Sequence, residues 1–239
     1  MQPWRMAAPD DYPALLDEGR RLHAPTRIGK PGISRGYWWC FPPAQLLRAR
    51  YSIDVQGLEH VQPGPAILLG NHLSLMDPII VGITARWRTI FFTKEEVFEQ
   101  PGAIFFRLTG QIPLRRGDEE STKWALDMSA SILRMGHKLC VYPEATRSPD
   151  GVSLHRLHRR ILVPVLQANP GVAVHAMSIG YSPKRMGRMQ VNLRFSPALD
   201  LDHGSMSAND LTDAVRDAIL ALGGMPYVHR FGREVKDRG

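Results

Sequence analysis

Short apolar runs alternate with longer amphipathic stretches from residue 51 onward, and this alternation predicts an α/β sheet. Each run is only a few residues long and is bounded by turn-forming residues, as is typical of buried strands. We expect seven strands, at Ser52–Gln56, Ala66–Leu69, Thr89–Thr93, Ile112–Leu114, Lys138–Tyr142, Ala173–Ile179 and Gln190–Phe195.

The stretches between these runs predict helices at Asp77–Arg86, Gly102–Leu108, Ser121–Met135, Leu157–Gln167 and Ala208–Leu222. The last is the clearest, because Ser207 and Asp210 form a capping box before it and two glycines follow it. Pro164 is expected to kink or shorten the helix that contains it, since proline lacks a backbone N–H.

Residues 1–50 are rich in proline, and we expect an irregular cover segment with one short amphipathic helix at Asp11–Leu22. An aromatic cluster within it has two open interpretations: a cover packed on the domain, or an anchor at a membrane interface. Its members are Tyr37, Trp38, Trp39 and Phe41. Residues 51–239 show no repeat and no linker, so they are expected to form one domain.

The composition is that of a globular protein, with 44% apolar and 22% charged residues. Cys40 and Cys140 have no framework spacing, which favours a reducing compartment and argues against a zinc site. A net charge of +7 favours anionic partners. No nucleic-acid-binding motif is present, and no apolar run approaches the ~20 residues of a membrane span. The chain is therefore expected to lie on an anionic membrane surface, although ordinary solvated surface would also explain its basic segments.

The candidate chemistry begins where the strand Ala66–Leu69 ends. His72 lies in the predicted turn and Asp77 at the start of the next helix, with Asp77 as N-cap and Pro78 as first helical residue. A turn between them allows an Asp–His hydrogen bond, which a general base needs to fix its tautomer. The His-x4-Asp spacing alone is weak evidence, because a histidine often caps a loop without further function.

Two further segments strengthen that hypothesis. Gly110, Ile112 and Arg116 lie in a second block, and Pro143, Glu144, Thr146, Arg147 and Ser148 in a third. With Asn71, His72 and Asp77, these blocks resemble, in order and separation, those of the lysophospholipid (1-acylglycerol-3-phosphate) acyltransferase family. The resemblance covers roughly residues 51–199. Arginine suits the third block physically, because its planar fork matches phosphate oxygens.

The resemblance implies a single-domain fold with a mixed sheet of about seven strands flanked by helices. It implies acyl transfer from acyl-CoA or acyl-carrier protein to a lysophospholipid hydroxyl, in lipid metabolism. His72 would be the general base and Asp77 would orient it, with Asn71 suggested as oxyanion support. Neither a metal nor a cofactor is implied, and the expected location is cytoplasmic, on the inner face of the membrane. The substrate-binding residues implied are Asn71, Lys94, Arg115, Arg116, Glu144, Thr146, Arg147 and Ser148.

The chain also departs from the family pattern. Ala145 replaces a glycine, so a positive φ at this position would strain the backbone. The strand around Val172–Met177 lacks the family's proline, and Arg159-Arg160 replace a lysine and a glycine. These changes affect the expected acyl-chain pocket and acceptor.

Two alternatives therefore stay open. The first is the same chemistry on another acceptor, such as glycerol 3-phosphate, an ornithine lipid or another hydroxyl lipid. The second is a non-catalytic lipid-binding relative. A serine hydrolase built on Ser74 is disfavoured, because no Gly-x-Ser-x-Gly motif surrounds that residue.

Overall fold

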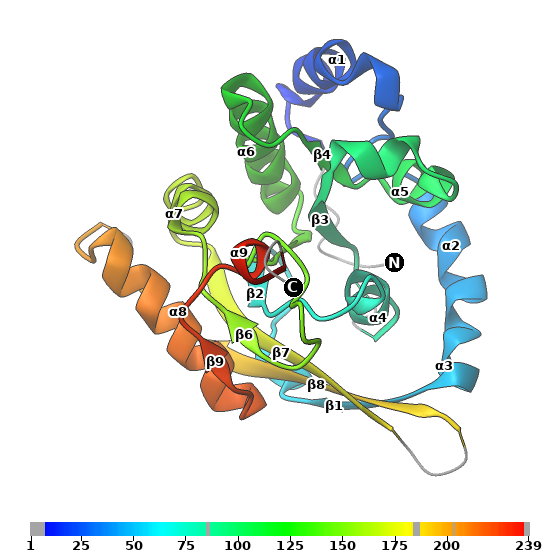
Figure 1. Ribbon diagram of the computed structural model, residues 1–239. Coiled ribbons are helices and arrows are strands. Elements are labelled where there is room, and N and C mark those ends of the chain that lie inside the picture. Colours follow the sequence, from blue (N-terminus) through cyan, green and yellow to red (C-terminus); the bar gives the residue numbers. More distant parts are fainter. Residues whose placement is uncertain (1–7, 85–86, 184–186, 203, 237–239) are drawn as a thin grey trace.

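The computed structural model describes residues 8–84, 87–183, 187–202 and 204–236. Its main sheet has seven strands in the order β1-β8-β7-β2-β5-β3-β4 (Figure 1). Their bounds are β1 Tyr51–Gln56, β2 Ala66–Gly70, β3 Thr89–Lys94, β4 Ile112–Leu114, β5 Lys138–Val141, β7 Ala173–Pro183 and β8 Met189–Ala198. Neighbouring strands are parallel except β7 and β8, which are antiparallel. The predicted mixed sheet of about seven strands is confirmed.

Helices cover both faces of this sheet, and alternate residues of β2 show how. Ile67 and Leu69 belong to the cluster that includes residues of α7 and α8, whereas Ala66 and Leu68 belong to the cluster that includes residues of α4. Every residue of β2 is buried, as expected for a central parallel strand covered on both faces. The helices are α4 Asp77–Thr84, α5 Ala103–Thr109, α6 Glu119–Arg134, α7 Arg159–Gln167 and α8 Ala208–Gly223.

The structure of residues 8–50 corrects the prediction of an irregular cover segment. The expected helix is present as α1 Tyr12–Leu22, but residues 36–50 are not irregular, because they form α2 Gly36–Gln45 and α3 Leu47–Arg50. Prolines 42 and 43 concealed α2 in the sequence, since proline disfavours a helix interior. Tertiary contacts hold the helix instead: the Tyr37 hydroxyl donates to the Trp87 carbonyl, and Gln45 Nε2 donates to the Ile83 carbonyl, both at 3.2 Å.

Helix α1 packs on α6 through a close contact. A Cβ on Gly19 would lie 2.2 Å from the ring of Trp124, so only glycine lets the two helices approach this closely. The Trp124 indole donates to the Leu15 carbonyl at 2.7 Å. The N-terminal helices are thus joined to the same core as α6.

Other boundaries differ from the predictions for local reasons. α7 begins at Arg159 rather than at residue 157, because His158 is extended and its N–H donates to the Pro143 carbonyl. α8 has the predicted cap, with Ser207 accepting from the Asp210 N–H. Residues 85–86, the end of the helix predicted from Asp77, lie outside the described residues.

Several short elements gave no sequence signal. Strands β6 Leu154–His155 and β9 Tyr227–Val228 pair in parallel, and helix α9 Gly232–Lys236 follows. Three short 3-10 helices complete the fold, η1 Ala24–Thr26, η2 Leu58–His60 and η3 Glu95–Glu99. Elements of two to five residues are too short to show hydrophobic periodicity. Within the ranges given above, no helix has the length and hydrophobicity needed to cross a bilayer.

Candidate functional site

His72 and Asp77 meet at the carboxyl end of β2, where parallel sheets commonly place their sites. His72 Nδ1 lies 2.7 Å from Asp77 Oδ2. A carboxylate only accepts hydrogen bonds, so Nδ1 carries the hydrogen and Nε2 keeps its lone pair. The Asp77 side chain is fully buried, whereas that of His72 is 19% exposed. An oriented imidazole with one free nitrogen and access to solvent can accept a proton from a bound hydroxyl.

The Asp77 carboxylate accepts further hydrogen bonds besides the one from His72. Its Oδ2 also accepts from the N–H groups of Leu73 and Ser74, at 2.7 and 2.8 Å, and its Oδ1 accepts from the Tyr181 hydroxyl at 2.5 Å. This corrects the prediction of an N-cap: the side chain bonds back to the turn rather than forward to the helix, which begins at Asp77 itself.

Sequence reasoning missed Tyr181, because the strand was expected to end at Ile179. In the structure β7 continues to Pro183 and brings Tyr181 to the site. The hydrogen bond to Asp77 and burial both raise the pKa of the Tyr181 phenol, with burial the larger cause. A second ring, that of Tyr142, stacks on His72 with centroids 4.4 Å apart. Both tyrosines restrict how the site can rearrange.

Glu144 of the third block fixes the backbone of the His72 turn. Its Oε2 accepts from the His72 N–H at 2.7 Å, and its Oε1 accepts from the His155 N–H at 2.8 Å. Burial raises the pKa of Glu144 to about 8, while the two N–H groups act in the opposite direction. The Ser148 N–H donates to the His72 carbonyl at 2.7 Å. Glu144 therefore connects the first and third blocks. We correct its expected role from positioning a substrate phosphate to holding these two segments together.

Three further residues expected to bind substrate are engaged elsewhere. The Asn71 side chain is fully buried, and its amide donates to the Ile179 carbonyl and accepts from the Ile179 N–H, both at 2.8 Å. The Ser148 hydroxyl is buried and donates to Asp150 at 2.7 Å. Both side chains are buried and hydrogen-bonded within the protein, and we correct their role to a structural one.

Arg115 is the third. Its guanidinium forms a double contact with Glu95, at 2.6 and 3.0 Å, and a further ion pair with Asp118 at 3.0 Å. It also donates to the Leu22 carbonyl at 3.1 Å. Glu95 in turn contacts His23 at 2.9 Å. Arg115 thus connects α1 to the segment that follows β3. Carboxylates already occupy the planar guanidinium group that a phosphate would need, so we correct its role to a structural one.

The remaining predicted residues lie at the exposed side of the third block. Arg116 donates to the Ala145 carbonyl, which brings the second block to the third. Lys94 and Arg147 are exposed, and Thr146 is partly buried. Partial burial lowers the pKa of Lys94, and the charges of Arg116, Arg233 and Lys236 lower it further. Arg233 and Lys236 both belong to α9.

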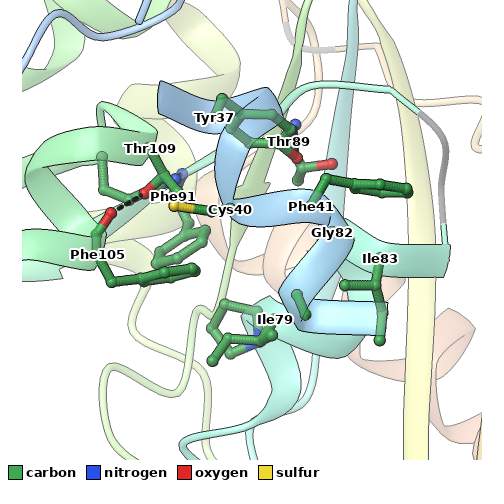
Figure 2. A pocket seen from close by; sticks show the side chains of 13 residues that line it. Tyr37, Cys40, Phe41, Ile79, Gly82, Ile83, Thr89, Phe91, Phe105 and Thr109 are labelled. Carbon is green, nitrogen blue, oxygen red and sulfur yellow. Dashed lines mark hydrogen bonds between the residues drawn. The ribbon is translucent and has the colours of Figure 1, made fainter. Parts of the chain in front are cut away.

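The structure has an apolar pocket, which Figure 2 shows from close by. Helices α2, α4 and α5 and strand β3 form its walls. Its lining includes Pro78, the residue that follows Asp77 in the chain. The side chains labelled in Figure 2 include Cys40, Phe41, Ile79, Ile83, Phe91 and Phe105. In the part of the chain that the structure describes, no three His, Cys, Asp or Glu side chains gather to hold a metal ion.

Residues 52–181 match the family model described as Acyltransferase. The chain is 31% identical over 104 residues to a chloroplastic 1-acyl-sn-glycerol-3-phosphate acyltransferase of Arabidopsis thaliana, which covers 42% of this chain and 29% of that protein. It is 29% identical over 136 residues to a lyso-ornithine lipid O-acyltransferase of Rhodobacter capsulatus, covering 56% of this chain and 46% of that protein. The chain thus spans less than half the length of these curated relatives.

The fold is similar to that of the 1-acyl-sn-glycerophosphate acyltransferase of Thermotoga maritima. The TM-score is 0.59 at 23% sequence identity, and the match covers 85% of this chain and 82% of that structure. At this identity the likeness concerns the fold alone.

The backbone of the third block predicts that Ala145→Gly stabilises the protein. Ala145 has a φ of 58°, in the left-handed region that disfavours a residue with a Cβ. We expect the free energy of unfolding to rise by about 0.5–1 kcal/mol, measured by denaturant titration. The matched control is Ala130→Gly within α6, where the same change should lower stability by about 1 kcal/mol. A loss of stability in Ala145→Gly would contradict the strain.

Proposed function

The chain belongs to the Acyltransferase family, and from that premise we propose that it moves a fatty acyl group from a thioester to the hydroxyl of a lysophospholipid, with His72 as general base. The observation that carries the proposal is the 2.7 Å contact between His72 Nδ1 and the buried Asp77 carboxylate. The donor is acyl-CoA or acyl-carrier protein. The favoured acceptor is 1-acylglycerol 3-phosphate.

In the proposed reaction, the acceptor hydroxyl attacks the carbonyl carbon of the thioester. His72 Nε2 takes the hydroxyl proton as the new C–O bond forms. The tetrahedral intermediate then collapses, the C–S bond breaks, and the departing thiolate receives that proton. Asp77 keeps the imidazole in the required tautomer and stabilises its charged form. The scheme needs neither a metal nor an acyl-enzyme.

The apolar pocket is suited to the acyl chain. Its lining includes Pro78, which directly follows the residue that orients the base, and its walls are largely aliphatic and aromatic. An acyl chain placed there would bring its thioester carbon close to His72. We therefore propose that residues of α2 and α4, including Ala44, Ile79 and Ile83, set the accepted chain length.

The charge on the other side of the site favours a phosphorylated acceptor over the main alternative. Lys94 and Arg116 lie close enough that their charges interact, and both are cations. Such surroundings attract a phosphomonoester and disfavour the amino group of a lyso-ornithine lipid. The ornithine lipid stays the second candidate, because one relative carries that name.

We also propose that α2 lies against a membrane surface. Trp39 and Leu46 are 73% and 76% exposed, and seven residues separate them, which places them on the same side of a helix. Tyr37, by contrast, is buried against the domain. The two interpretations of the aromatic cluster thus apply to different residues: Tyr37 belongs to the cover, whereas Trp39 is suited to an interface.

The first prediction concerns the base. His72→Ala should lower turnover by about 10²–10⁴-fold while the protein stays folded, since a general base contributes that much. Asp77→Asn should also lower turnover with little change in KM for the acceptor. Product formation from palmitoyl-CoA and lysophosphatidic acid is followed by mass spectrometry. The control, His229→Ala, changes an exposed histidine and should keep wild-type turnover. Wild-type turnover in folded His72→Ala would contradict the mechanism.

A second prediction tests the pocket. Ala44→Phe should fill it and shift preference toward short acyl donors. We expect the ratio of kcat/KM for palmitoyl-CoA to that for octanoyl-CoA to fall by about tenfold or more, because each excluded methylene lowers transition-state binding. Ala49→Phe adds the same side chain at an exposed position outside the pocket and should leave the ratio unchanged. An unchanged ratio in Ala44→Phe would place the acyl chain elsewhere.

A third prediction tests the membrane contact. Wild type should co-sediment more with anionic than with neutral vesicles, and less at high salt, because salt screens surface charges beyond about 8 Å at 0.15 M. Trp39→Ser with Leu46→Ser should reduce binding to both kinds of vesicle. Val152→Ser, which changes another exposed apolar residue, is the control. Equal binding by wild type and the double variant would exclude α2 as the contact.

A further inference from the structure

The end of the chain returns to the third block. After α8, strand β9 pairs with β6, which follows the third block directly. The Leu154 N–H donates to the Pro226 carbonyl at 2.9 Å, and the Arg156 N–H donates to the Arg230 carbonyl at 3.0 Å. Figure 1 shows α9, in red, away from the outer edge of the sheet, near the labels of β2 and β6. The C-terminal segment is therefore held by backbone hydrogen bonds on both sides of β9.

Side chains then fix the start of α9 against the site. The Phe231 ring stacks on His158, with centroids 4.2 Å apart, and the Arg156 guanidinium lies 4.8 Å from the Phe231 centroid. A Cβ on Gly232 would lie 3.0 Å from Thr146 Cγ2 and 3.6 Å from the His155 ring. The absence of a side chain at Gly232 lets α9 approach Thr146 closely. The residue after Gly232 is Arg233.

This docking gathers several cations at one place. The charge of Arg233 acts on both Lys94 and Arg116, and that of Lys236 acts on Lys94. Partial burial lowers the pKa of Arg116, and Arg233 lowers it further, whereas Glu96 opposes both. The charge of Glu96 acts on both Lys94 and Arg116 and offsets part of this positive charge, and an anion bound there would offset more of it. A phosphate group, with its charge spread over several oxygens, is the anion that arginine forks match best.

We propose that Arg233 of α9, together with Lys94 and Arg116, binds a phosphate group of a substrate beside Thr146. The proposal rests on the proposed acyl transfer, because the substrates of that reaction carry the phosphate group. The group belongs either to the acceptor, as a phosphomonoester, or to the CoA part of the donor. The chain's last helix would then be a substrate-binding element.

The test measures binding apart from turnover. Glycerol 3-phosphate represents the acceptor phosphate and 3′,5′-ADP that of CoA, and both are titrated into the full chain by calorimetry. Arg233→Gln should weaken one of them by about tenfold or more, as expected for loss of a charge-assisted contact. Arg233→Lys should recover part of the loss, since it keeps the charge without the fork. The matched control is Arg230→Gln, which makes the same charge change at an exposed position of the same segment and should bind as wild type does.

Turnover identifies the source of the phosphate. With an acceptor site, Arg233→Gln lowers kcat/KM for lysophosphatidic acid and leaves that for monoacylglycerol unchanged. With a donor site, it lowers kcat/KM for acyl-CoA with either acceptor, but not for an acyl thioester of N-acetylcysteamine, which carries no phosphate. Equal binding of both probes by wild type and Arg233→Gln would overturn the proposal. Binding lost in Arg233→Gln, with no acyl transfer by wild type, would keep the phosphate site and refute the proposed reaction.

Discussion

The geometry of the site depends on one buried charge, the carboxylate of Asp77. A charged group out of water is strongly unfavourable unless hydrogen bonds replace its hydration. Here four donors do so: the His72 imidazole, two backbone N–H groups of the turn, and the Tyr181 hydroxyl. The four hydrogen bonds that Asp77 needs therefore stabilise the turn, orient the imidazole, and connect the start of α4 to β7.

Glu144 extends this constraint from the turn to the rest of the chain. It holds the backbone N–H groups of His72 and His155, residues that are far apart in the sequence. Because His155 lies in β6, and β6 pairs with β9, the position of the last helix is connected to the position of the proposed base. The third block thus acts mainly to hold segments of the chain together, and Arg147 is its exposed basic side chain.

Two regions of opposite character flank the first and third blocks. On one side, α2 and α4 line an apolar pocket that includes Pro78, the residue after Asp77. On the other, Lys94, Arg116 and Arg233 gather positive charge. A lysophospholipid and an acyl thioester each combine a long apolar chain with a phosphate-bearing part. The site has the same division, and its proposed substrates would be oriented by it before any chemistry takes place.

The sequence by itself predicted the seven strands of the sheet, the capped helix α8, the His72–Asp77 contact and the strained backbone at Ala145. The strands and α8 follow from local patterns, namely short apolar runs and capping residues, whereas the expectation at Ala145 came from the resemblance to a family that has glycine there. It did not predict helix α2, whose prolines argue against it, or the roles of Asn71, Arg115 and Ser148. It also missed Tyr181 and α9. Whether a polar side chain is left for a substrate depends on which distant groups occupy it, and only the tertiary structure decides that, because a hydrogen bond between residues 71 and 179 leaves no periodic trace in the chain.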